Sequence, residues 1–127
     1  MIDFFLPNDI NHISGSIIKQ LNVNEAEKII VEMKTWQDIF YSLGHNKIDI
    51  IKMDIEGAEY EILDSILDSS IKVDQFLIEF HERFSVDGKD KSIKAIKKLK
   101  NHGFEIFAIS DTFEEISFIK KTIKYKI

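Results

Sequence analysis

The chain has 127 residues, of which 44% are hydrophobic and 31% charged, and it includes ten Phe and one Trp. That composition is typical of a globular protein and argues against disorder, and the length fits one domain over residues 1–127. The formal charge of −5 argues against a general nucleic-acid binder, which needs a basic surface. The sequence has no cysteine, no run of about 18 apolar residues and no signal-peptide pattern, so we expect a cytoplasmic protein without a membrane span.

The first 45 residues predict a hairpin followed by a helix. Ile2–Leu6 is an apolar run closed by a Pro-Asn turn signal, and the β-branched run Ile29–Met33 predicts a second strand, antiparallel to the first. Residues 14–16 form a turn or begin a helix. Thr35 is placed to cap a helix that Gly44 ends, with an apolar stripe made of Trp36, Ile39, Phe40 and Leu43.

Strands and helices alternate from residue 46 onward. The pattern predicts, in order, a strand from Ile48 to about Asp54, a helix from about Ala58 to Ser69, a strand Asp74–His81, a helix marked by Ile93, Ile96 and Leu99, a strand Phe104–Ile109 and a last strand Ile116–Ile119. This order indicates an α/β fold with a mostly parallel sheet flanked by helices. The last connection is short, so we expect the last strand to be antiparallel to its predecessor.

Charged residues gather where the strand that begins at Ile48 ends. That strand is apolar on both faces, so we expect helices to cover it on each side. Lys52 and Asp54 lie on one face of it because side chains alternate along a strand. Two charges at the end of a buried strand are costly unless they are paired or used. In open α/β sheets ligands bind at this end of the strands, so we expect the functional site here.

The segment Ile48–Glu59 closely resembles the hallmark segment of FkbM-type methyltransferases, which use S-adenosylmethionine. The helix start Tyr60–Leu63, the strand Phe76–His81 with its Glu and His, and the short helix at Thr35–Ile39 are also similar to that family. The resemblance covers roughly residues 31–120. It implies a Rossmann-like fold of the class I methyltransferase type, S-adenosylmethionine as cofactor, and methyl transfer.

The resemblance also implies a glycine-rich turn over which the cofactor lies, and this chain has no Gly-x-Gly. The sequence therefore looks like the C-terminal half of the fold without the N-terminal cofactor-binding half, plus an N-terminal β-hairpin. We expect the chain alone to bind S-adenosylmethionine poorly or not at all. The edge of the central strand would be bare, to be covered by Ile2–Leu6, by a second copy in a homodimer, or by a complementing N-terminal half.

Asp54 is the first candidate for a catalytic residue. The resemblance places it at the strand end, facing the transferred methyl group and the acceptor, where a carboxylate accepts or orients the proton of a hydroxyl. The structural alternative is a cap of the following helix. Lys52 is a second catalytic candidate, and a buried ion pair between Lys52 and Glu79 is the structural alternative.

The remaining candidates surround Asp54. Glu56 is expected to contact the cofactor together with Asp54, and also the acceptor; Glu79 and His81 are expected to contact the acceptor, and His81 to act as acid or base. We expect no metal ion. The four residues could nevertheless form an oxygen-rich site that suits Mg²⁺, Mn²⁺ or Fe²⁺, although no His-x-His pattern supports it. Two further positions have structural explanations: an acid at the helix start for Glu59, and a turn for Ser16.

Three functions follow from these residues. The leading one is S-adenosylmethionine-dependent methyl transfer to a sugar or natural-product hydroxyl, with this chain supplying the substrate-side half. The alternative is a non-catalytic remnant or partner subunit that docks through its open sheet edge. A third, metal-dependent phosphodiester hydrolysis, rests on the similarity of Ile50–Asp54 to a strand of EAL-type phosphodiesterases, whose barrel needs about 250 residues.

Overall fold

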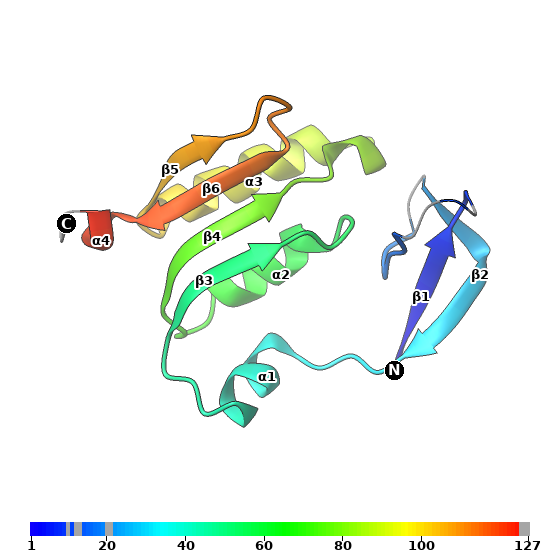
Figure 1. Ribbon diagram of the computed structural model, residues 1–127, viewed down its shortest axis with the longest axis horizontal. Coiled ribbons are helices and arrows are strands. Elements are labelled where there is room, and N and C mark those ends of the chain that lie inside the picture. The colour runs from blue at the N-terminus through cyan, green and yellow to red at the C-terminus, as the bar shows by residue number, and fades with distance from the viewer. Residues whose placement is uncertain (10, 12–13, 20–21, 125–127) are drawn as a thin grey trace.

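The chain forms an N-terminal hairpin and a four-stranded sheet backed by helices (Figure 1). This computed structural model describes residues 1–9, 11, 14–19 and 22–124. The elements in order are β1 (Ile2–Pro7), β2 (Val23–Val31), α1 (Trp36–Ser42), β3 (Ile48–Met53), α2 (Glu59–Leu67), β4 (Val73–Glu79), η1 (Glu82–Phe84), α3 (Gly88–Asn101), β5 (Phe104–Ile109), β6 (Glu115–Lys120) and α4 (Lys121–Lys124).

The N-terminal hairpin is antiparallel, as the sequence predicts. Ile2 is opposite Val31 and Pro7 is opposite Val23, with a bulge after Phe5. The second strand begins earlier than predicted because backbone pairing with β1 carries it through a polar stretch that shows no apolar period. Within the described residues 14–19 no helix begins; the backbone of Ser16 pairs instead with that of Phe5.

The first helix, α1, follows its capping signals. Thr35 accepts a hydrogen bond from the Asp38 amide through its hydroxyl, 3.0 Å away, and Gly44 takes a positive φ of 67° just past the end. None of the helices in the described part of the chain is both long and apolar enough to cross a membrane.

The four-stranded sheet has the order β3-β4-β6-β5. The β3–β4 pairing is parallel, and β6 is antiparallel to both β4 and β5. The prediction that the last strand opposes its predecessor is therefore confirmed. The sheet is mixed rather than mostly parallel in its pairings, because β6 inserts between β4 and β5 and breaks the run of parallel neighbours. The inserted position buries Phe118 completely.

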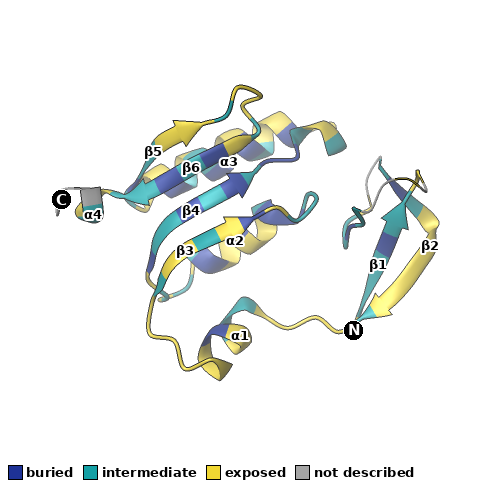
Figure 2. Cartoon of the chain, in the orientation of Figure 1, coloured by how far each residue is buried: buried dark blue, intermediate teal, exposed yellow. Residues whose placement is uncertain are grey.

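Helices α2 and α3 pack on the same face of this sheet (Figure 1). The core lies between these two helices and the sheet and includes Leu63, Ile66, Phe76, Leu99 and Phe118. The prediction that helices cover both faces of β3 is wrong for the described residues. On the face away from α2 and α3, Ile50 is 53% exposed, and Figure 2 shows the exposed positions along this strand. Strand β3 is also an edge of the described sheet, so an apolar run here does not mean burial on both faces.

Candidate functional site

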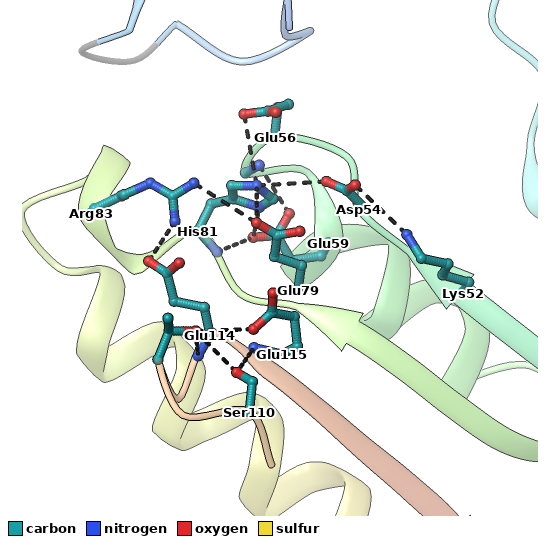
Figure 3. Close-up of polar contacts among 12 residues, drawn as sticks. Lys52, Asp54, Glu56, Glu59, Glu79, His81, Arg83, Ser110, Glu114 and Glu115 are labelled. Carbon is teal, nitrogen blue, oxygen red and sulfur yellow. Dashed lines mark hydrogen bonds and ion pairs between the residues drawn. The ribbon is translucent and has the colours of Figure 1, made fainter. Parts of the chain in front are cut away.

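The ends of β3 and β4 bring four polar side chains together (Figure 3). Asp54 follows β3 directly and His81 follows β4 by two residues; because the strands are parallel neighbours, both lie at the same end of the sheet. His81 Nε2 is 3.7 Å from Asp54 Oδ1, 3.7 Å from Glu56 Oε2 and 3.5 Å from Glu79 Oε1. We call Asp54, Glu56, Glu79 and His81 the carboxylate–histidine cluster.

The turn between β3 and α2 holds Glu56 in place. Gly57 has a positive φ of 95°, and Glu56 has a φ of 52°, which a side chain disfavours by about 1–2 kcal/mol. Ser16 Oγ donates a hydrogen bond to the Glu56 carbonyl oxygen at 2.8 Å, and Ser16 is almost completely buried. The turn explanation for Ser16 is therefore incomplete, because this residue joins the N-terminal segment to the cluster.

Glu59 fastens His81 to the start of α2, a role that the sequence interpretation missed. Its carboxylate is fully buried and accepts hydrogen bonds from the His81 amide at 2.8 Å and from the Gly57 amide at 2.9 Å. Oε1 of Glu59, the oxygen that accepts from the His81 amide, also lies 3.3 Å from His81 Nδ1. An acid in the first helical turn is common, so the sequence carries no signal that this one reaches across to β4.

Negative charge in the cluster raises the pKa of His81. Burial alone lowers the pKa of His81, but the hydrogen bond to Glu59 and the negative charges of Glu59, Glu56 and Glu79 outweigh it and raise that pKa. Burial raises the pKa of Glu59, but its hydrogen bonds with His81 outweigh this and keep it below the usual range. Burial, followed by the charge of Asp54, raises the pKa of Glu79.

In metal-free buffer, the free energy of unfolding should fall as His81 loses its proton. A raised folded pKa gives stabilisation that is complete below the ordinary histidine pKa of about 6.5 and lost as pH rises through the folded value. Denaturant unfolding from about pH 6 to about pH 9 measures this decline. His81→Gln should abolish it, whereas His102→Gln, at an exposed histidine, should keep it. A wild-type stability that is constant or rising over this range would contradict the prediction.

The predicted buried pair of Lys52 and Glu79 is wrong. The Lys52 side chain is 70% exposed and lies 3.6 Å from Asp54 Oδ2, because β3 places it on the face that the described helices leave open. Glu79 lies 3.8 Å from Arg83, which also pairs with Glu114. The sequence interpretation missed Arg83, although its position four residues after Glu79 is a spacing that allows ion pairing.

An apolar groove of about 400 Å³ opens beside the cluster, between the hairpin and α2. Asp54 and Glu56 form its polar end, and its apolar walls include Phe4, Ile17, Val31, Met33 and Ile62. A second hollow of about 400 Å³ lies near His102 and Phe104 at the other end of the sheet. The grouping of acid, imidazole and groove can orient a hydroxyl and accept its proton, and Asp54, Glu56 and His81 are also spaced to bind a metal ion.

A family model and several known proteins match this chain in sequence. The model of the "Methyltransferase FkbM domain" matches residues 3–106. A human protein named "Probable methyltransferase-like protein 24" is 30% identical over 96 residues, which are 67% of this chain and 26% of that protein. The rat protein of the same name is 28% identical over 112 residues, 77% of this chain and 30% of that protein.

A more distant relative is the "AMB antimetabolite synthetase AmbE" of Pseudomonas aeruginosa, 26% identical over 91 residues, which are 71% of this chain and 4% of that protein. The chain thus spans less than a third of the length of each of these three relatives. No solved structure matches it.

Proposed function

Because this chain belongs to the FkbM methyltransferase family, we propose that it takes part in the transfer of a methyl group from S-adenosylmethionine to a hydroxyl oxygen. The observation that carries the proposal is the convergence of Asp54, Glu56, Glu79 and His81 beside an apolar groove at the ends of β3 and β4. Ligands of open α/β sheets bind at such strand ends.

The reaction requires a methyl group to pass from a sulfonium to an oxygen. The carbon–sulfur bond breaks as the new carbon–oxygen bond forms, the sulfur keeps the bonding electrons, and the hydroxyl proton must leave. Asp54 is the proposed proton acceptor because its side chain is 43% exposed and lies on the groove. Lys52, 3.6 Å from Asp54, helps to hold that carboxylate.

The carboxylates also suit the donor. S-adenosylmethionine carries a positive sulfonium, and the negative charges of Asp54 and Glu56 favour its approach to the turn after β3. The chain has no Gly-x-Gly turn for the remainder of the cofactor, so we propose that residues of a second copy or of a complementing half complete the site. Weak binding to the chain alone follows from this division.

The acceptor is proposed to be a sugar or a natural product with one hydroxyl near Asp54. The groove offers mostly apolar walls, which suits an acceptor with an apolar portion beyond the reacting hydroxyl. Glu79 and Glu56 are placed to accept hydrogen bonds from further hydroxyls. The similarity to a protein named as an antimetabolite synthetase supports a natural-product acceptor.

A second candidate function is that of a non-catalytic partner subunit. It is favoured by the exposed edge of β3, where Ile50 is 53% exposed and no strand pairs on the outer side in the described sheet. Such a subunit would associate through that edge and show no affinity for S-adenosylmethionine. Light scattering of the purified chain, combined with a cofactor titration, separates the two functions.

Transfer of an isotope-labelled methyl group tests the proposed function. The chain, in its full native sequence context, is incubated with labelled S-adenosylmethionine and with sugar and natural-product hydroxyl compounds. We expect label in an ether methyl of the acceptor and an equal amount of S-adenosylhomocysteine. Label recovered only in unreacted donor, with every acceptor tested and a folded sample, would contradict the proposal.

A further inference from the structure

One nitrogen of His81 is buried without a hydrogen bond. His81 is 2% exposed, and among the described residues its Nε2 atom has no hydrogen-bond partner. Three carboxylate oxygens, from Asp54, Glu56 and Glu79, surround that nitrogen at nearly equal distances of 3.5–3.7 Å. A protonated Nε2 that donated to one carboxylate would lie about 2.8 Å from it, so the spacing is too long for a hydrogen bond.

The other ring nitrogen explains which way the lone pair points. Nδ1 lies 3.3 Å from a carboxylate oxygen of Glu59, and a carboxylate can only accept there, so we assign the ring proton to Nδ1. When His81 is neutral, this assignment leaves the lone pair on Nε2, the atom that the carboxylates of Asp54, Glu56 and Glu79 surround. Histidines that bind metal ions usually donate their second ring N–H to a carboxylate in this way, which fixes the tautomer and the ring orientation.

The spacing of the ligand atoms matches a single ion. Asp54, Glu56 and His81 each offer one ligand atom, and these three atoms all lie within 4.8 Å of one another. A cation with bonds of about 2.0–2.3 Å holds neighbouring ligand atoms roughly 3 Å apart and opposite ones up to roughly 4.5 Å apart. Closure of the three side chains around one ion therefore needs only small movements.

We propose that Asp54, Glu56 and Nε2 of His81 bind one hard divalent cation of the Mg²⁺ or Mn²⁺ class. Two carboxylates with one imidazole and no thiolate favour such ions over a structural zinc. Glu79 lies 3.5 Å from Nε2 but also pairs with Arg83. We therefore do not count it as a ligand; its proposed role is to accept hydrogen bonds from water bound to the ion. Three ligands leave coordination positions open toward the groove.

The open coordination positions would allow the ion to bind the hydroxyl of the acceptor. A hydroxyl bound to a divalent cation loses its proton more readily, and the ion also orients the oxygen. This use rests on the proposed methyl transfer, whereas binding of the ion does not. The expectation of no metal from the sequence reflected the absence of any tight histidine pattern; the three ligands come instead from the ends of two strands that pair in parallel.

The test is a titration of Mn²⁺ into chelator-treated protein without cofactor or acceptor, with free Mn²⁺ followed by electron paramagnetic resonance. We expect one Mn²⁺ per chain, and at least about tenfold weaker binding in Asp54→Asn and in His81→Gln. The matched control is Asp49→Asn, because Asp49 is an exposed aspartate on β3 that pairs with Lys47, and this variant should bind like the wild type.

Circular dichroism confirms that each variant is folded, and Asp54→Asn, at a partly exposed side chain, carries the test if His81→Gln does not fold. A folded wild type that binds no Mn²⁺, or equal binding in Asp54→Asn and Asp49→Asn, would overturn the cation site. Because no methyl donor is present, a failure of methyl transfer leaves this result untouched, and the absence of Mn²⁺ binding leaves the proposed methyl transfer standing.

Discussion

Replacement of Glu59 by alanine is expected to lower the free energy of unfolding by about 3–5 kcal/mol. The carboxylate is fully buried, and it accepts hydrogen bonds from the amides of His81 and Gly57. Its removal takes away the negative charge next to the buried His81 and leaves two buried amides without an acceptor. Removing one partner of a buried pair in this way is strongly destabilising. Denaturant unfolding near neutral pH measures the change.

The control for this prediction lies two residues further along the same helix. Glu61 is exposed, so Glu61→Ala should change the free energy of unfolding by no more than about 0.5 kcal/mol. The loss in free energy of unfolding for Glu59→Gln should lie between these two values, because glutamine keeps one acceptor oxygen but lacks the charge. A loss below about 1 kcal/mol in Glu59→Ala would show that Glu59 does not fasten His81 to α2.

Replacement of Asp54 by asparagine is expected to lower the turnover of methyl transfer by about 10²–10⁴-fold. Asparagine has nearly the same shape but cannot accept the hydroxyl proton. We expect the loss in kcat rather than in KM for the acceptor, because the missing interaction is one that forms as the proton leaves. Release of S-adenosylhomocysteine measures the rate.

Asp49→Asn serves again as the control, since this residue lies on β3 away from the cluster and its carboxylate pairs with Lys47. It should keep wild-type turnover. Turnover of Asp54→Asn equal to that of Asp49→Asn would show that Asp54 takes no part in the reaction, and the proton acceptor would then have to be sought at Glu79 or His81.

Local patterns predicted most of the elements. The apolar run of β3, the helical spacing in α2 and the capping at Thr35 each depend on neighbours in sequence, and each element appears close to its expected bounds. The position of β6 between β4 and β5 depends on contacts between distant residues. A short turn decides the direction of the last strand, but not which strand it meets on its other side.

The site was predictable where it depends on strand direction. Asp54 and His81 meet because neighbouring parallel strands end at the same edge of a sheet, which the alternating pattern implies. The side chain of Lys52 lies on the expected face of β3, but which faces are covered is a property of the whole fold, so its burial was predicted wrongly. The contacts of Glu59 with His81 required the packing of α2 against β4.

The central claim is that the turn after β3 and the carboxylate–histidine cluster form the reaction site of a methyltransferase. The most direct test is a titration of S-adenosylmethionine into the ¹⁵N-labelled chain, followed by amide shifts in NMR spectra. We expect weak, fast-exchanging binding, with the largest shifts at residues 54–58 and at His81. Shifts confined to the other end of the sheet around Phe104, with residues 54–58 and His81 unchanged, would contradict the claim.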